Sequence, residues 1–256
     1  MSKKHAKRLE DTNNNVNEVK PEGEIRKLVL DKSALEQIAS LAAQQVSPIS
    51  TTFVVSMTNH EFAQLQESYD RRLYLYGAIT PAEEYCIDSA HGTNANNIIE
   101  KIMNINRMDV NTVQSERDPI ILYINSPGGS VVEGFAIIEA IKASKTPVYT
   151  VNIGQWSSMA FLIGITGHRR FSLPNMTFLF HDGWNVMANS SNKVRDLARF
   201  DTCYEKKVVR KHVLKHTKLS LKEYKKRARE EFYMLTDDAL KYGVIDQIVT
   251  DIDDIL

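Results

Sequence analysis

Residues 118–154 read DPIILYINSPGGSVVEGFAIIEAIKASKTPVYTVNIG. The first part, 118–126, is a continuous apolar run with β-branched residues, which is typical of a strand buried on both faces. Apolar residues recur at helical spacing in 131–144, and Pro147 separates that segment from a second apolar strand at 148–154. A strand, a helix and a second strand within about 35 residues predict a βαβ crossover unit with parallel strands.

Further strands and helices are predicted on both sides of this unit. The segments before it are a strand at 71–79 and an amphipathic helix at 95–106. Those after it are an apolar helix ending near 166, strands at 170–174 and 176–181, a long helix at about 191–216, a helix capped by Ser220, a short helix at 237–243 and a strand at 244–249. We therefore expect an α/β fold of repeated strand–helix units, with a long helix in the C-terminal half.

Composition narrows the class of protein. The chain has 256 residues, of which 43% are hydrophobic and 25% charged, as in ordinary globular proteins. Lys+Arg and Asp+Glu both number 32, so no net charge favours nucleic acid or a membrane surface as a partner. No apolar run approaches the roughly 20 residues of a membrane span, and the N-terminus lacks the apolar region of a secretory signal. Two cysteines, Cys86 and Cys203, are too few for a disulfide framework and favour a reducing compartment, so we expect a cytoplasmic protein.

The N-terminal quarter carries no chemical signal. Residues 1–25 are polar and rich in Asn and Lys, which predicts a disordered arm. Residues 26–68 form an extension of unknown role, in which a capping-box spacing at Ser33 predicts a helix at 35–46. A short strand at 47–57 and a short helix at 59–70 are predicted to follow.

Three polar features follow predicted strands. The segment 125–130, NSPGGS, is either a tight turn with Ser130 as the N-cap or a loop whose amides bind a negative charge. In 154–160, GQWSSMA, the two serines are either helix caps or contain a nucleophile at a strand-to-helix turn. His181 ends an apolar strand and is either a structural histidine or a general base. Taken together they favour a catalytic site, because groups at the ends of parallel strands converge on one edge of the sheet.

Four motifs in this order resemble the Clp protease proteolytic subunit, the ClpP family of serine peptidases. They are YINSPGGSV, GQWSSMA, RRFSLPNMTFLFH and EFYMLTDDALKYGVIDQIV. The resemblance covers about residues 70–250 and implies a ClpP/crotonase-like fold, with a peptidase domain at 69–256. Residues 1 to about 65 have no counterpart in it.

The resemblance implies roles for individual residues. Ser158 takes the place of the nucleophile, Ser157 that of a small residue, and His181 that of the general base. The backbone amides of Gly129 and Met159 take the place of the oxyanion hole. The acid of the triad falls on Glu231, with Glu230 as the alternative. No metal and no cofactor are implied, and the histidines show no spacing typical of a metal site.

The sequence departs from the family pattern at several positions. A glutamate at 231 replaces the usual aspartate, which keeps the charge but adds a methylene. The spacing from Ser158 to His181 is about two residues shorter than usual, and Ala160 stands where glycine is common. After His181 the sequence DGWNVMANSSNKV stands where family members have a glycine-rich stretch, which aligns the substrate and contacts a second ring.

The function implied is a serine endopeptidase that cleaves peptide bonds with a Ser-His-acid triad. Family members form heptameric rings that stack in pairs, and an AAA+ unfoldase delivers protein substrates to them; a phage-type maturation peptidase is also compatible with the N-terminal quarter. The main alternative is a catalytically inactive ClpP-like ring subunit with a structural or regulatory role. A hydratase or isomerase on the related crotonase fold is a third reading, but it has no need for Ser158 and His181.

Overall fold

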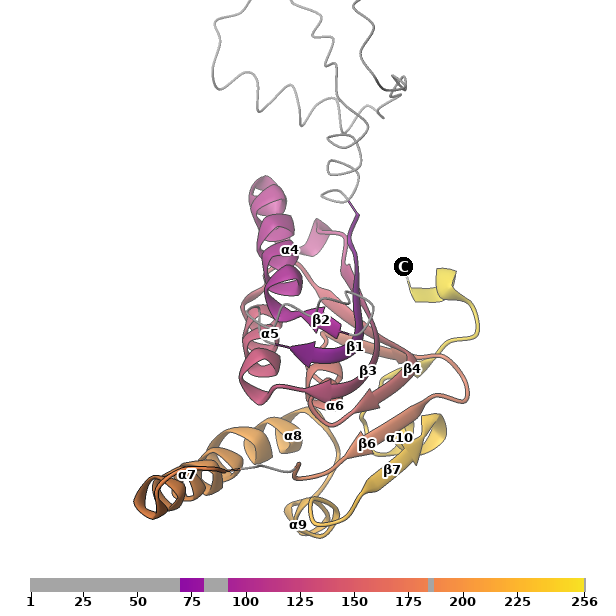
Figure 1. Ribbon diagram of the computed structural model, residues 1–256. Coiled ribbons are helices and arrows are strands. Elements are labelled where there is room, and N and C mark those ends of the chain that lie inside the picture. The colour runs from indigo at the N-terminus through magenta and orange to yellow at the C-terminus, as the bar shows by residue number, and fades with distance from the viewer. Residues whose placement is uncertain (1–69, 81–91, 184–186, 256) are drawn as a thin grey trace, which may run out of the picture. The chain divides into compact units, whose positions relative to one another are not determined.

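The computed structural model describes residues 70–80, 92–183 and 187–255 (Figure 1). All of them belong to one unit of the chain, Ser68–Leu256. The arm predicted at 1–25, the extension at 26–68 and the elements predicted within it lie outside the described residues, as does Cys86.

A largely parallel sheet forms the centre of this unit, as predicted from residues 118–154. Its main path runs in the order β2-β1-β3-β4-β5-β8, and every neighbouring pair on this path is parallel. The strands are β1 (Arg72–Thr80), β2 (Gly92–Asn94), β3 (Ile120–Gly129), β4 (Val148–Ser157), β5 (Arg169–Ser172) and β8 (Gln247–Ile248). The predicted α/β class and the βαβ unit β3-α5-β4 are confirmed.

Three helices cover one face of the sheet (Figure 1): α4 (Ala95–Met108), α5 (Val131–Ala143) and α6 (Met159–Gly164). Helix α4 begins where the Asn94 side chain accepts a hydrogen bond from the Asn96 amide. It buries residues at helical spacing toward the sheet: Ala95, Ile98, Ile102 and Ile105. A smaller cluster lies apart from this core and joins Tyr123, Val151 and Phe171 to Val249 and Ile255 of the C-terminal segment.

The ends of two strands differ from the prediction. Strand β3 continues through the glycines to Gly129, because Gly128 and Gly129 pair with Ala78 and Ile79 of β1. Strand β4 continues to Ser157, because 155–157 pair with β6 (Thr177–Phe180). In both cases pairing with a distant strand extends a segment whose own residues favour a turn.

Two strands of the described residues were not predicted, the short β2 and β7. Strand β7 (Phe232–Leu235) pairs with β6 in the antiparallel direction, off the main path of the sheet. Its Phe232 and Met234 are buried, whereas Tyr233 and Leu235 are exposed.

The long helix predicted at 191–216 is present as a helical arm with a change of pitch. It consists of α7 (Ser191–Tyr204), a π-helical turn η3 (Glu205–Val209) and α8 (Arg210–His216). Figure 1 shows α7 at the far end of this arm, away from the sheet, and α7 contains no buried residue. The chain returns through α9 (Leu221–Arg227) and, after β7, through α10 (Thr236–Lys241).

Three short 3₁₀ turns complete the part of the fold that the structure describes: η1 (Asp109–Asn111), η2 (Gln114–Glu116) and η4 (Ile252–Ile255). None of the helices in the described part of the chain combines the length and the apolar character that a membrane crossing requires.

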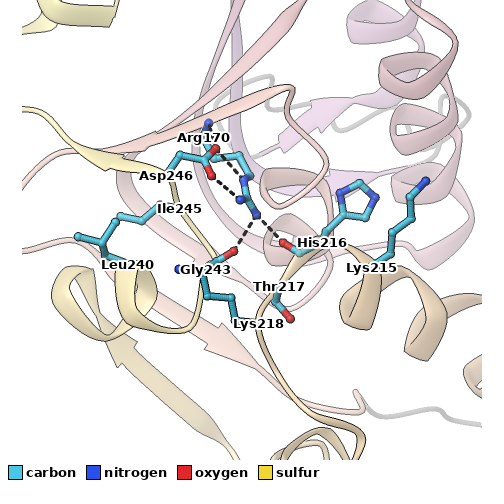
Figure 2. Close-up of a pocket in the computed structure, with 9 residues that line it drawn as sticks. All are labelled: Arg170, Lys215, His216, Thr217, Lys218, Leu240, Gly243, Ile245 and Asp246. Carbon is cyan, nitrogen blue, oxygen red and sulfur yellow. Dashed lines mark hydrogen bonds and ion pairs between the residues drawn. The ribbon is translucent and has the colours of Figure 1, made fainter.

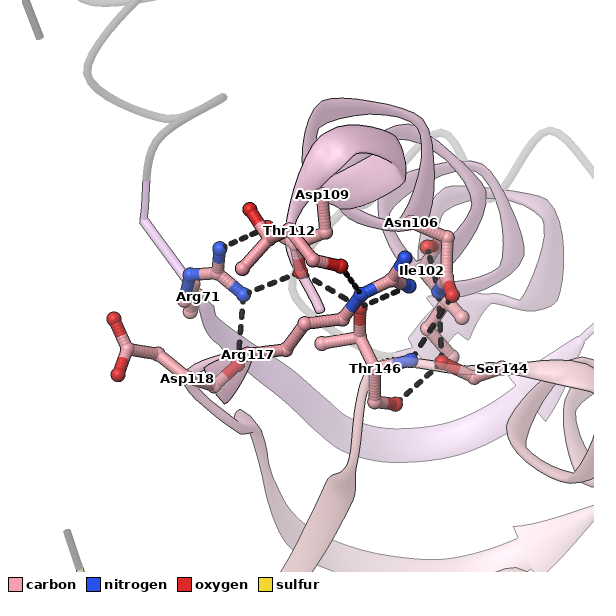
Figure 3. Close-up of polar contacts among 9 residues, drawn as sticks. All are labelled: Arg71, Ile102, Asn106, Asp109, Thr112, Arg117, Asp118, Ser144 and Thr146. Carbon is pink, nitrogen blue, oxygen red and sulfur yellow. Dashed lines mark hydrogen bonds and ion pairs between the residues drawn. The ribbon is translucent and has the colours of Figure 1, made fainter. Parts of the chain in front are cut away.

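A polar network fixes the start of β1 to the loops beside it (Figure 3). Asp109, which follows α4, is almost fully buried; Arg71 donates to both of its carboxylate oxygens and Thr146 to one of them. Burial raises the pKa of Asp109, but the hydrogen bonds from Arg71 and Thr146 outweigh it and hold that pKa below its usual value. The Asp109 carboxylate thus joins Arg71 and Thr146, which lie 38 and 37 positions away from it along the chain.

Candidate active site

Ser158 stands at the junction between β4 and α6 in a conformation that few side chains adopt. Its φ is 56° and its ψ is −120°, and although it occupies the N-cap position its side chain makes no capping hydrogen bond. Its amide donates to the carbonyl of Leu179 at 2.9 Å, which ties the turn to β6. A strained backbone at a strand-to-helix turn is the geometry that presents a nucleophilic hydroxyl. The capping role is therefore not the one that Ser158 performs in this structure.

Ser157 is placed differently from its neighbour. It is buried, and its hydroxyl donates to Oε1 of Gln155 at 3.0 Å. Its place in the sheet is opposite Leu179 of β6. These contacts favour Ser158 over Ser157 as the reactive hydroxyl.

Gly128 lies directly against the serine turn. Its φ is 97°, and a Cβ atom added there would lie 2.7 Å from the Ser157 carbonyl oxygen and 2.8 Å from the Met159 amide nitrogen. Ser126 shapes this approach, because its hydroxyl donates to the carbonyl of Gly77 at 2.6 Å and accepts from the Gly128 amide at 3.1 Å. Only glycine allows the two chain segments to approach so closely.

The amide of Gly129 points away from β1. Gly129 is opposite Ile79 in the parallel ladder, and Ser130 donates to the Ile79 carbonyl at 2.9 Å. In a parallel ladder a residue forms its hydrogen bonds with the residues before and after the one opposite it. Ile79 therefore bonds to the residues on either side of Gly129, and the N–H of Gly129 itself is directed away from β1. The amide of Met159, as the first residue of α6, has no acceptor within its helix. Both predicted oxyanion amides are therefore free of the backbone pairing that would occupy them.

His181 and Glu231 are brought together by the two antiparallel strands. The register pairs Phe180 with Phe232, so the residues just beyond them, His181 and Glu231, lie opposite each other. His181 Nδ1 is 3.0 Å from Glu231 Oε1. The carboxylate side chain is 57% exposed and the imidazole 16% exposed, so the pair sits at the surface of this unit with the ring turned inward.

The other ring nitrogen of His181 is enclosed and unpartnered. Nε2 is buried and makes no hydrogen bond with any atom of the described residues, Ser158 Oγ included. The structure therefore joins the predicted base to the predicted acid, but does not join it to the predicted nucleophile.

Glu230, the alternative acid, is engaged elsewhere. Its carboxylate lies 3.5 Å from Nη1 of Arg227, and that guanidinium also lies over the ring of Phe232 at 4.2 Å. The 3.0 Å contact to His181 belongs to Glu231. The geometry favours Glu231 for the acid's place, and the catalytic roles of all these residues stay predictions.

A pocket of about 280 Å³ lies between the end of α8 and the segment that follows α10 (Figure 2). None of the predicted site residues lines it. Arg170 crosses it and is fully engaged: it donates to the Asp246 carboxylate and to the carbonyls of His216 and Gly243. Because the guanidinium is neutralised by Asp246, the pocket offers no unpaired arginine charge to a ligand. Within the described ranges no three His, Cys, Asp or Glu side chains gather in a way that could hold a metal ion.

Two contributors to the site carried no signal in the sequence. Leu179 acts through its carbonyl, which any residue would supply, and β7 is a four-residue strand whose partner lies more than 50 positions away. The segment EFYML (231–235) matches the family pattern, but its residues alone do not predict a strand. Only the pairing with β6 makes the position of Glu231 clear.

Three comparisons with known proteins bear on the family and the fold of this chain. A family model described as Clp protease matches residues 85–251. The ATP-dependent Clp protease proteolytic subunit 2 of Thermobifida fusca is 32% identical over 163 residues, which cover 63% of this chain and 77% of that protein. Among solved structures, a point mutant of ClpP1 from Listeria monocytogenes is similar with a TM-score of 0.61 and 21% identity, covering 76% of this chain and 99% of that one. This last similarity concerns the fold, and it bears out the predicted ClpP/crotonase-like class.

Proposed function

The chain belongs to the Clp protease family, and from that premise we propose that it is a serine endopeptidase acting inside a ring-shaped homo-oligomer. The observation that carries the proposal is the 3.0 Å contact between His181 Nδ1 and Glu231 Oε1. His181 follows β6, and β6 pairs with β4, the strand that leads directly into Ser158. An imidazole held by a carboxylate, at the end of a strand that pairs with the one leading to a partly exposed serine, supports a role in acyl transfer.

The proposed reaction begins at the Ser158 hydroxyl. Glu231 accepts the Nδ1–H of His181, which leaves the lone pair on Nε2 free to take the Ser158 proton. The serine oxygen forms a bond to the peptide carbonyl carbon, and the carbonyl electrons move to its oxygen. The imidazolium then gives its proton to the departing amine, and a water molecule hydrolyses the acyl-enzyme by the same route.

The negative oxygen of the tetrahedral intermediate would be held by the amides of Gly129 and Met159. Both N–H groups lack backbone partners in their own elements, and the close approach of Gly128 to the serine turn keeps the two segments together. Donors fixed in this way are commonly worth about 10²–10³-fold in rate.

The contact between Ser158 Oγ and His181 Nε2 would form when substrate binds or when subunits assemble. Catalytic hydrogen bonds are often long or absent before the substrate is bound. The unpartnered Nε2 of His181 supports this view, because a buried ring nitrogen without a partner is costly and gains from a hydroxyl donor.

Assembly is proposed to involve the arm. Helix α7 buries none of its own residues, and Leu197 and Phe200 on it are 47% and 62% exposed. Apolar side chains on a projecting helix are explained by contact with another copy of the chain. The substrates would be proteins or peptides, supplied by an AAA+ unfoldase and cleaved in the cytoplasm; the T. fusca relative is called an ATP-dependent subunit.

A second candidate is an inactive ring subunit that shapes or regulates an assembly. The observation that favours it is the missing hydrogen bond between Ser158 and His181, together with the exposed glutamate in the place of the acid. Such a subunit would keep the fold and the interfaces without turnover.

Labelling with a fluorophosphonate probe separates these candidates. The full chain, Ser158→Ala and Ser157→Ala are compared in the assembled state, because the probe reacts only with an activated serine. An active peptidase is labelled in wild type and in Ser157→Ala but not in Ser158→Ala. Labelling lost only in Ser157→Ala would refute the assignment of the nucleophile, and an unlabelled but assembled wild type identifies the inactive subunit.

A further inference from the structure

The helix that follows Ser158 is short and is fixed at its far end by a side chain from the arm. Helix α6 has six residues, all buried. In its last turn the carbonyl of Leu162 lies 3.0 Å from Nε2 of His212 and accepts a hydrogen bond from Oγ1 of Thr166 at 2.8 Å. A carbonyl near the end of a helix lacks a partner within the helix, so these contacts satisfy a group that would otherwise be unpaired.

The contact defines the protonation of His212. A carbonyl oxygen only accepts, so Nε2 of His212 carries the hydrogen; Thr166 Oγ1 lies 3.1 Å from the same nitrogen and shares it. Nδ1 is then an unprotonated, buried atom without a partner among the described residues. Burial lowers the pKa of His212 to about 4, although the hydrogen bond to Leu162 acts in the opposite direction. The ring is therefore neutral at neutral pH.

His212 belongs to the part of the arm that is packed against the rest of the unit. It is 4% exposed, whereas α7 earlier in the same arm has no buried residue. Phe135 of α5 meets the ring edge-on with centroids 6.0 Å apart. The hydrogen bond to Leu162 thus connects an exposed arm to the buried helix that begins at Met159.

We propose that His212 is a positioning residue, which couples the arm to α6 and so sets the place of Ser158 and of the Met159 amide. The inference rests on the proposed function for its catalytic consequence. Helix α6 has only six residues and all of them are buried, so a displacement near its last carbonyls is expected to reach its first amide.

His216 provides a matched control one turn further along α8. Its ring lies 4.6 Å from that of His212, and burial lowers its pKa to about 4 as well, with the neighbouring His212 and Lys215 acting in the same direction. Its Nε2, however, is buried without a partner among the described residues, and its contact to Arg170 uses the main-chain carbonyl. The two histidines therefore differ in the hydrogen bond to α6.

The test compares His212→Leu, His212→Gln and His216→Leu in the full chain. Two quantities are measured: the rate at which Ser158 reacts with a fluorophosphonate, and the rate of amide hydrogen exchange in the peptide containing α6. Loss of one hydrogen bond predicts about tenfold slower labelling and about tenfold faster exchange of α6 in His212→Leu. His212→Gln keeps an N–H donor near the Nε2 position and is expected within about threefold of wild type. His216→Leu is expected to leave both rates near wild type.

Wild-type labelling and exchange in His212→Leu overturn the proposal. Equal losses in His212→Leu and His216→Leu, or a failure of glutamine to restore either rate, also overturn it, since they indicate a loss of packing and not of the hydrogen bond. If wild type is not labelled at all, the proposed function fails on its own, and the exchange of α6 in the three variants still decides whether His212 fixes this helix.

Discussion

His181 Nδ1 and Glu231 Oε1 are 3.0 Å apart although 50 positions of chain separate them, and the antiparallel register of β6 and β7 makes the contact. The carboxylate is 57% exposed, so its electrostatic effect is weakened by solvent. What it supplies is orientation, because it holds the hydrogen on Nδ1 and leaves Nε2 as the acceptor.

Replacing Glu231 by glutamine is expected to lower kcat/KM for a peptide substrate on the order of 100-fold or more, because an amide can stabilise the wrong tautomer of the imidazole. Glu230→Gln is the control and is expected within about twofold, since Glu230 contacts Arg227 and its ion pair lies at the surface. Hydrolysis of a fluorogenic peptide measures both. A larger loss in Glu230→Gln would assign the acid to that residue.

Gly128→Ala is expected to abolish labelling of Ser158 and to lower the free energy of unfolding by about 3 kcal/mol. The added methyl group would lie 2.7–2.8 Å from backbone atoms of the serine turn, at a φ of 97°. Gly243→Ala is the control: it has a φ of 66°, but there the methyl group meets the flexible side chain of Lys218. That variant should lose about 1 kcal/mol and stay reactive. Equal labelling of both would contradict the role given to Gly128.

Asp109→Asn is expected to lower the free energy of unfolding at pH 7 on the order of 3 kcal/mol, because it leaves the Arg71 guanidinium without its buried carboxylate. The folded pKa of Asp109 lies below its ordinary 3.8, so its contribution is present above pH 3.8 and is lost as the pH falls below that value. Urea unfolding between pH 7 and pH 3 measures both effects. Asp70→Asn, which removes an exposed pair with Arg72, should cost less than about 1 kcal/mol.

The two neighbouring histidines of α8, His212 and His216, predict a loss of stability in mild acid. The folded pKa of each is about 4, against an ordinary value of 6.5, so the folded state binds fewer protons than the unfolded chain between these values. Their contribution is complete above pH 6.5 and is lost progressively as the pH falls toward 4, because protonation of the buried rings favours the unfolded chain. The charged groups that face the pair are Glu139 and Lys142 of α5, Lys215 of α8 and Arg170 of β5.

Chemical unfolding at several pH values measures this slope. The double variant His212→Gln, His216→Gln removes both titrating groups and should flatten the curve between pH 6.5 and 4. An unchanged slope in the double variant would show that other groups produce the acid sensitivity.

Charges placed on the outer arm are expected to prevent assembly. Leu197→Glu and Phe200→Glu together should shift the chain to smaller species in sedimentation velocity, because they place two carboxylates in the proposed contact surface. Val113→Glu changes an equally exposed apolar residue away from the arm and should leave the assembly intact. If the arm variant assembles like wild type, the contact between copies lies elsewhere.

The fold could be predicted where residues follow one another closely along the chain. The strands at 118–126 and 148–154 and the helix between them are visible in the apolar pattern, because each is decided by its own residues. The extension of β3 over Gly128 and Gly129, and of β4 to Ser157, depends on pairing with β1 and β6, which no local pattern contains.

The candidate site also contains parts that the sequence could predict and parts that it could not. Ser158 and His181 could be located because each follows a recognisable strand, and the family pattern assigns them roles. The contact of Glu231 with His181 requires the four-residue strand β7, whose partner is distant in sequence. The link from His212 to Leu162 uses a main-chain carbonyl, and no spacing of residue types reveals that atom.

The pairing of β6 with β7 also holds together the two ends of the chain segment that carries the arm. These ends are held by the ladder and by the Asp182 amide, which donates to the Ala228 carbonyl at 3.0 Å. Residues can be added to or removed from the outer arm without changing the distance between His181 and Glu231, because both lie at these ends. The proposed contact surface between copies can therefore diverge while His181 and Glu231 stay where they are, which leaves the arm free to change without altering the proposed acid–base pair.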